Sequence, residues 1–147
     1  MALKRSSGLR KKAKNPVSKT KGRIQALLRL RAIERDGGCV LRDYPITGEC
    51  GPYKADGDLI LQAEHLVGRA NSISYGDLDN IVCLCMKHHF YFKKQHGALY
   101  WSLIEEIIGP ERWEKVQAWE RDKSPHRMYA SDWLRIEESL STPQKAL

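Results

Sequence analysis

Side chains that can bind a metal ion are concentrated in the middle of the chain. All four cysteines and three of the five histidines lie between residues 39 and 89 of the 147. Two residues separate Cys85 from His88, and Cys39 and Cys50 bracket a turn-rich segment with little apolar core of its own. Four thiolate and imidazole ligands suit tetrahedral Zn²⁺. We therefore predict that Cys39, Cys50, Cys85 and His88 bind a structural zinc ion.

Cys83 leaves two other interpretations open. On an extended strand Cys83 and Cys85 point to the same face, so a site made of Cys39, Cys50, Cys83 and Cys85 is also compatible with the spacing. Four reduced cysteines can equally pack as small apolar side chains. Ten residues lie between the first two cysteines, whereas about two to four are usual in zinc knuckles.

The adjacent histidines His88 and His89 indicate a second site. Neighbours on a helix are rotated by about 100°, so the two imidazoles cannot easily bind the same ion. If His88 completes the zinc site, His89 turns toward the strand end that carries Glu64 and His65. A carboxylate and an imidazole around one hard cation, with a second imidazole free to accept a proton from water, form a minimal site for phosphodiester hydrolysis.

Hydrophobic periodicity predicts an α+β fold around these residues. We expect strands at 59–66 and 81–84, joined by a polar loop, and helices at 24–36, 86–95 and 98–108. Two further helices follow, one opened by Pro110 and one capped by Ser131. The aromatic residues of these helices recur at helical spacing, which is typical of core packing.

Positive charge is concentrated at the N-terminus. Residues 1–23 contain nine lysines and arginines and no acidic residue, whereas the rest of the chain has 16 basic and 18 acidic residues. This segment is either a solvated tail or a flexible arm that neutralises phosphates. We accordingly divide the chain into an arm at 1–23, a domain at 24–108, and a helical extension at 109–147 that packs on the domain or forms an interface.

The composition is that of a soluble globular protein, with 41% hydrophobic and 29% charged residues. No apolar run approaches the roughly 20 residues of a membrane span, and no apolar segment follows the basic N-terminus as in a signal peptide. We therefore expect no membrane association and a reducing, cytoplasmic compartment.

Three segments together resemble the HNH nuclease motif of the ββα-metal fold. They are A-E-H-L at 63–66, D-L-D-N at 77–80 and C-L-C-M-K-H-H at 83–89. The resemblance covers about residues 24–108. Segments 35–42, 63–72 and 100–109 are similar to small phage and prophage HNH endonucleases, including NinG-type recombination proteins. Those proteins have a CxxC knuckle where this chain has Cys85 and His88.

The resemblance implies a role for each residue of the motif. His65 is expected to be the general base, and Asn80 to hold the loop by hydrogen bonds, with Asn71 as the alternative for that supporting role. Glu64 and His89 are expected to bind the catalytic ion. One carboxylate and one imidazole suit Mg²⁺ or Mn²⁺, although Ni²⁺ or Zn²⁺ is also compatible.

The implied activity is hydrolysis of DNA to 5′-phosphate and 3′-hydroxyl ends. The substrate would be duplex or branched DNA in phage recombination, junction processing or packaging, within a bacterial host cell. A homodimer is compatible with this activity. The expected phosphate contacts are Arg69, Lys93 and, in the arm, Lys11, Lys12 and Lys14. Two alternatives stay open: a zinc-stabilised nucleic-acid-binding module that does not cut, and a zinc-containing interaction domain.

Overall fold

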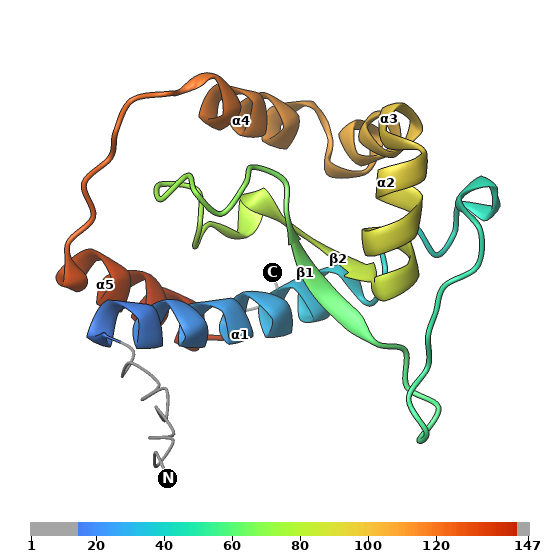
Figure 1. Ribbon diagram of the computed structural model, residues 1–147, viewed down its shortest axis with the longest axis horizontal. Helices are drawn as coiled ribbons and strands as arrows, with labels where there is room; N and C mark the ends of the chain where they lie inside the picture. The colour runs from blue at the N-terminus through green and yellow to red at the C-terminus, as the bar shows by residue number, and fades with distance from the viewer. Residues whose placement is uncertain (1–14, 144–147) are drawn as a thin grey trace, which may run out of the picture.

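A two-stranded antiparallel sheet lies at the centre of residues 15–143, the part of the chain that the computed structural model describes (Figure 1). Strand β1 (Leu61–His65) pairs with β2 (Ile81–Cys85), so that Leu61 lies opposite Cys85 and His65 lies opposite Ile81. The predicted α+β class is confirmed. β1 is shorter than the expected 59–66, because its pairing with β2 is limited to five residues.

Helices surround the sheet. Their bounds are α1 (Pro16–Asp36), α2 (Lys93–Gln95), α3 (Gly97–Ile108), α4 (Pro110–Arg121) and α5 (Ala130–Ser141). Three short helical turns complete the order: η1 (Pro45–Thr47), η2 (Leu78–Asn80) and the π-helical η3 (Lys87–Phe92). Within residues 15–143, none of the helices has the length and apolar character that crossing a membrane requires.

Helix α1 begins eight residues earlier than predicted. The Asn15 side chain accepts a 2.8 Å hydrogen bond from the Ser18 backbone N–H, and Pro16 occupies the first helical position. Both are strong helix-start signals, but the apolar periodicity used for the prediction starts only at Ile24. The proposed arm at 1–23 is therefore wrong for residues 16–23, which are helical. The helix ends as predicted, at Gly37 in the left-handed region with φ of 70°.

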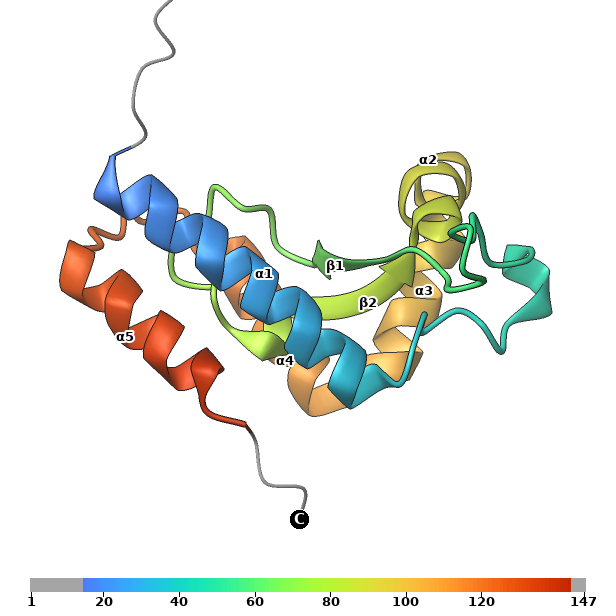
Figure 2. The same ribbon diagram turned by 90° about the horizontal axis from the view of Figure 1, so that it is seen from below.

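Two apolar clusters cover the two faces of β2, whose residues are all buried. On one face Ile81 and Cys83 pack with α1 and α5. On the other face Val82 and Leu84 pack with α3 and α4. Helix α5 lies alongside α1 in both views of the fold (Figures 1 and 2). The sheet is thus held from both sides by helices that come before and after it in the chain.

The start of α5 differs from the prediction. Ser131 was expected to cap this helix, but it lies inside the first turn. The carboxylate of Asp132 reaches back and accepts a 2.8 Å hydrogen bond from the Tyr129 backbone N–H. This bond stabilises a helix start at Ala130, with Tyr129 rather than Ser131 as the N-cap residue.

Two arginines from different helices bind the turn that leads into β2. Arg35 of α1 donates to the Leu78 carbonyl oxygen at 2.7 Å and to the Ile81 carbonyl oxygen at 2.5 Å. Arg112 of α4 donates to the Asp79 carbonyl oxygen at 2.7 Å and also reaches Ile81. Burial lowers the pKa of Arg112 to about 10. We call this pair the arginine clamp.

Candidate metal centre and neighbouring histidine groove

Three thiols and one imidazole converge beside the end of β2. Ligand atoms of Cys39, Cys50, Cys85 and His88 all lie within 4.8 Å of one another. The distances from His88 Nδ1 to the Sγ atoms are 3.4 Å for Cys39, 3.7 Å for Cys50 and 3.0 Å for Cys85. Zinc bonds of about 2.0–2.3 Å in a tetrahedron separate the ligand atoms by roughly 3.5–3.8 Å. This cluster can hold a metal ion and is compatible with structural zinc.

The second ring nitrogen of His88 is held on the opposite side from the sulfurs. His88 Nε2 donates to the Gly48 carbonyl oxygen at 3.1 Å and lies 2.9 Å from the Thr47 hydroxyl oxygen. Because that hydroxyl itself donates to the Tyr44 carbonyl oxygen at 2.7 Å, its lone pair is available to the imidazole. These bonds place the proton on Nε2 and leave the Nδ1 lone pair directed at the three thiols, as a metal ligand requires.

Burial makes the Cys39 and Cys50 thiols weaker acids. It raises the pKa of Cys39, and together with the neighbouring thiols it raises the pKa of Cys50 to about 12. A bound divalent ion would reverse this preference, because a coordinating thiol is deprotonated by the charge of the metal. Free thiolates are therefore disfavoured in the cluster unless an ion is bound.

Cys83 does not take part in the cluster. It lies two residues before Cys85, but its side chain packs against α1 in the second apolar cluster. Burial raises the pKa of Cys83 to about 12. The all-cysteine alternative is thus not the one the structure forms, and the predicted set with His88 is confirmed as the group that can bind a metal.

A separate groove of about 650 Å³ is lined by residues of α1, β1 and η3 and contains both of the predicted catalytic histidines. His65 of β1 and His89 of η3 both line it, together with Arg69. Its remaining walls come from α1 and from the residues flanking β1: Gly22, Gln25, Ala26, Arg29, Ile60, Leu61, Gln62, Ala63, Gly68 and Phe90. The two histidines therefore share one opening toward solvent.

His65 is held by a backbone carbonyl. Its Nε2 lies 2.9 Å from the Tyr75 carbonyl oxygen, to which it donates. This bond leaves Nδ1 as the nitrogen with a lone pair. Burial lowers the pKa of His65, although the bond to Tyr75 opposes the effect and the nearby Arg69 adds to it. A neutral imidazole with a free lone pair can accept a proton.

Asn80 ties together the loop on which this geometry depends. It is fully buried, and its Oδ1 accepts from the Val67 backbone N–H at 2.7 Å. Its Nδ2 donates to the carbonyl oxygens of Val67 at 3.2 Å and Ser74 at 3.1 Å. Because Ser74 precedes Tyr75, Asn80 fixes the carbonyl that orients His65. Asn71 assists, since its Oδ1 accepts from the Ser74 N–H at 3.1 Å.

Glu64 and His89 are brought into direct contact. One carboxylate oxygen of Glu64 meets His89 Nε2, and His89 Nδ1 lies 2.7 Å from the Gln62 side-chain oxygen, to which it can donate. When its only proton is on Nδ1, His89 turns a lone pair toward the carboxylate; when Nε2 is also protonated, His89 donates a hydrogen bond to Glu64. Two electron-pair donors that face each other fit a shared cation, either a proton or a metal ion. The pair therefore offers two ligands for the predicted catalytic ion.

Lys93, a predicted phosphate contact, is not among the residues that line the groove. Its ammonium pairs with the second carboxylate oxygen of Glu64, and its side chain lies over the rings of Tyr100 and Trp101, each centroid 5.6 Å from Nζ. Burial raises the pKa of Glu64, but the hydrogen bonds from His89 and Lys93 outweigh it and hold the pKa below its usual value. The phosphate contact at Lys93 stays a prediction, and in this structure the Glu64 carboxylate binds its charge.

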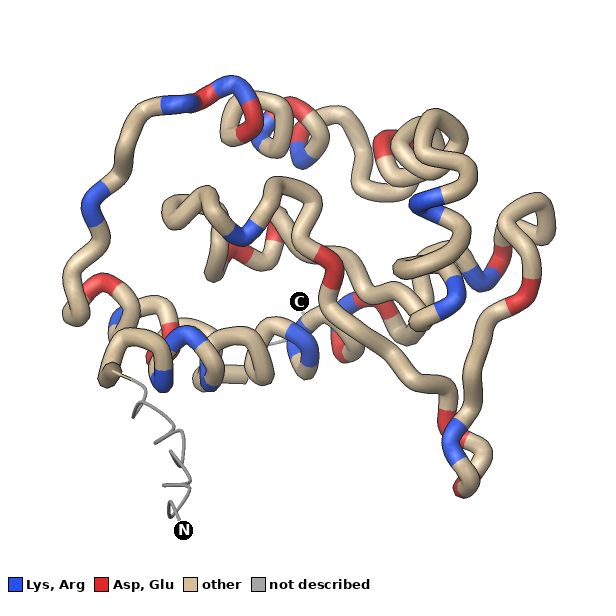
Figure 3. The backbone as a smooth tube through the Cα atoms, viewed as in Figure 1, with Lys and Arg blue, Asp and Glu red and all other residues tan. Residues whose placement is uncertain are grey.

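The other predicted DNA contacts have different outcomes. Arg69 is exposed and lines the groove. Lys11, Lys12 and Lys14 lie outside the described residues. Lysines and arginines recur along α1 (Figure 3), and one of them, Arg29, lines the groove while its Nε donates to the Leu61 carbonyl oxygen at 2.7 Å.

Sequence reasoning missed the further side chains that bind the Glu64–His89 pair: Gln62 contacts His89, and Lys93 contacts Glu64. Gln62 lies two residues before Glu64, so strand alternation places both side chains on one face. Lys93 follows His89 by four residues, which on a helix brings both side chains to the same side. Both spacings were visible in the sequence, but neither residue type is an expected ligand for a hydrolytic ion.

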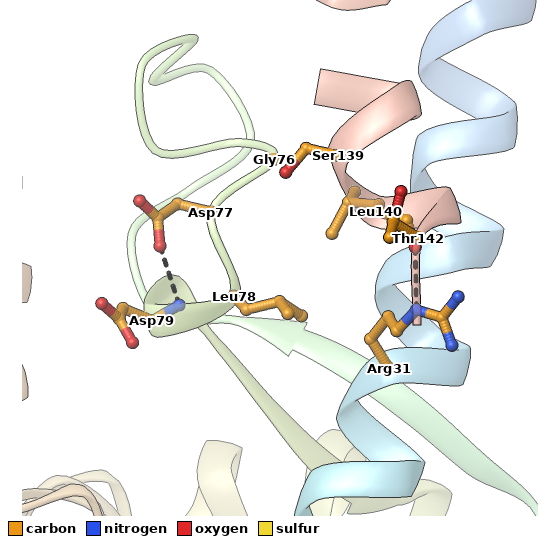
Figure 4. A pocket seen from close by; sticks show the side chains of 8 residues that line it. All are labelled: Arg31, Gly76, Asp77, Leu78, Asp79, Ser139, Leu140 and Thr142. Atoms are coloured by element: carbon orange, nitrogen blue, oxygen red, sulfur yellow. Dashed lines mark hydrogen bonds between the residues drawn. The ribbon is translucent and has the colours of Figure 1, made fainter. Parts of the chain in front are cut away.

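A separate polar pocket of about 280 Å³ lies between η2 and the end of α5 (Figure 4). There Arg31 donates to the carbonyl oxygens of Leu140 at 2.8 Å and Ser141 at 3.2 Å, and so caps α5. The Asp77 carboxylate accepts from the Asp79 backbone N–H at 2.9 Å. These groups satisfy one another, and we assign them a structural role.

No protein-family model matches the chain, and no curated protein or solved structure matches it significantly.

Proposed function

We propose that the protein is a metal-dependent endonuclease of the HNH type that hydrolyses DNA phosphodiester bonds to 5′-phosphate and 3′-hydroxyl ends. One observation carries the proposal: His65, held at Nε2 by the Tyr75 carbonyl, opens into the same groove as His89, which contacts Glu64. The motif resemblance supports this assignment and favours a phage recombination, junction-processing or packaging substrate.

Each residue has a defined task in this proposal. His65 Nδ1 accepts the proton of the attacking water, while the Tyr75 carbonyl keeps the imidazole in the required tautomer. Arg69 and Arg29 on the groove walls hold phosphates of the bound strand. Glu64 and His89 would hold the ion, which when bound supplies Lewis-acid stabilisation of the developing negative charge. The Cys39–His88 zinc cluster fixes the start of η3, which carries His89.

A zinc-stabilised nucleic-acid-binding module without cleavage activity is the second candidate. It is favoured by one contact, the Lys93 ammonium on Glu64, because this carboxylate already has a positive partner within the protein. In that case the groove residues would bind a nucleic acid strand and the Glu64 pair would be structural.

Nicking of supercoiled plasmid separates the two candidates. Wild type and His65→Ala are incubated with DNA, with and without added Mg²⁺ or Mn²⁺, and His96→Ala serves as a control because this exposed histidine lies outside the groove. We expect wild type and His96→Ala to nick only with added metal, and His65→Ala to be slower by about 100-fold or more while still binding DNA. Binding by all three proteins without cleavage under any metal condition would establish the non-catalytic module instead.

A further inference from the structure

The carboxylate of Glu64 is neutralised from within the protein. Glu64 is only 5% exposed, and a buried carboxylate is costly unless a positive group accompanies it. Lys93 supplies that charge through its contact with Oε1, while His89 occupies Oε2. All three groups thus meet at the position where a catalytic ion would bind.

The Lys93 side chain is exposed enough for its ammonium to move into solvent. Its side chain is 31% exposed, whereas that of Glu64 is 7% exposed. The Lys93 ammonium lies 5.6 Å from the ring centroids of Tyr100 and Trp101. A long, flexible lysine stem can move its charge into solvent without moving the helix backbone.

A divalent ion and the ammonium compete for the same carboxylate. An ion held by Glu64 and His89 would lie within a few ångströms of Nζ, where the two positive charges repel each other strongly even at a protein-like dielectric constant of about 20. Both cannot remain on Glu64. The ammonium is the group that can leave, because His89 is held at Nδ1 by Gln62.

We infer that Lys93 is an exchangeable internal cation: it neutralises Glu64 until a divalent ion binds there, and the ion then releases the ammonium toward solvent, where it becomes available to a substrate phosphate. This inference rests on the proposed function for the identity of the Glu64 site. It assigns Lys93 a positioning role in metal binding that differs from a permanent ion pair.

Metal affinity tests the competition directly. Mn²⁺ binding to zinc-loaded protein is measured by the electron paramagnetic resonance signal of the free ion, for wild type, Lys93→Met and Lys94→Met. Lys94 is the adjacent exposed lysine, so its replacement changes the net charge equally. We expect Lys93→Met to bind Mn²⁺ about tenfold tighter than wild type or more, Lys94→Met to match wild type, and Glu64→Gln to lose the site. Equal or weaker binding by Lys93→Met overturns the inference.

Acetylation of the wild-type protein avoids any folding defect of the variant. Lysine modification by an N-hydroxysuccinimide acetate is followed by peptide mass spectrometry as Mn²⁺ is raised. Lys93 is expected to react several-fold faster at saturating Mn²⁺, with Lys94 unchanged and with no metal effect in Glu64→Gln. Unchanged protection of Lys93 at saturating Mn²⁺, or no Mn²⁺ bound at all, contradicts the exchange.

Plasmid nicking distinguishes failure of the inference from failure of the proposed function. If wild type nicks DNA while Mn²⁺ affinity and Lys93 acetylation show no exchange, the nuclease stands and Lys93 is a fixed partner of Glu64. If both assays show exchange and no protein nicks DNA, the cation exchange stands and the nuclease assignment falls.

Discussion

Two consecutive histidines are directed to two different sites. His88 turns its Nδ1 to three thiols and its Nε2 to Thr47 and Gly48, whereas His89 reaches Glu64 on β1. The rotation of about 100° between neighbouring helix positions explains the separation. As predicted, neither imidazole serves both sites.

Replacement of single cysteines tests the composition of the metal cluster. Cys85→Ala removes a ligand, so purified protein should contain well under one zinc ion per chain and its free energy of unfolding should fall by more than about 3 kcal/mol. Cys83→Ala is the matched control from the same strand. It should keep the zinc and lose only about 1 kcal/mol of packing. Zinc is measured by elemental mass spectrometry and stability by urea unfolding.

Loss of zinc from Cys83→Ala with retention by Cys85→Ala would contradict the ligand set.

The sequence could predict this set, because ligand type and the Cys85–His88 spacing restrict the choice. It could not decide between His88 and Cys83. That choice depends on Cys83 packing against α1, which is a tertiary contact.

At the scale of elements, the loop between the strands carries much of the candidate site. The Tyr75 carbonyl that binds His65 belongs to it, and Asn80 and Asn71 hold it in shape. The two strands and the helical character of most segments were predictable from periodicity. The contacts of this loop were not, because a polar segment without periodicity does not reveal which of its side chains turn inward.

Gly76 in this loop lies directly against α5. A Cβ atom at this position would collide with Ile136 Cγ2. We expect Gly76→Ala to lower the free energy of unfolding by about 1–3 kcal/mol, because the loop or α5 must shift to relieve the overlap. Gly68→Ala is the control, since nothing lies within 4 Å of its added Cβ. Urea unfolding measures both.

A double variant identifies the cause of the Gly76 effect. Combining Gly76→Ala with Ile136→Ala removes the colliding atom. The double variant should therefore lose less free energy of unfolding than the sum of the losses in the two single variants. Additive losses would show that Gly76 is needed for another reason.

At the scale of the whole molecule, charged pairs connect α4 to the centre of the fold. Lys115 lies 2.8 Å from an Asp79 oxygen, and its hydrogen bond holds the pKa of Asp79 below the usual 3.8. A carboxyl group with a lowered pKa stabilises the folded state above that usual value, and the contribution is lost as the pH falls through the folded-state pKa. Both side chains are about half exposed, which limits the effect.

Asp79→Asn should therefore be less stable than wild type at pH 7, by less than about 1 kcal/mol. The difference should shrink as the pH is lowered from 7 to 3.5, and also in 1 M salt at pH 7. Asp43→Asn is the control, because that side chain is 83% exposed and faces Arg42 at 3.8 Å. Urea unfolding at each pH gives the comparison, and a difference that grows on acidification would contradict the assignment.

The arginine clamp limits how the fold can be divided. Arg35 precedes both strands in the chain and Arg112 follows them, yet both bind the carbonyl oxygen of Ile81. A fragment that ends at residue 108 would keep the thiols and the groove histidines, but it would lack Arg112. A fragment that keeps both arginines must therefore extend into α4, beyond the predicted domain boundary at residue 108.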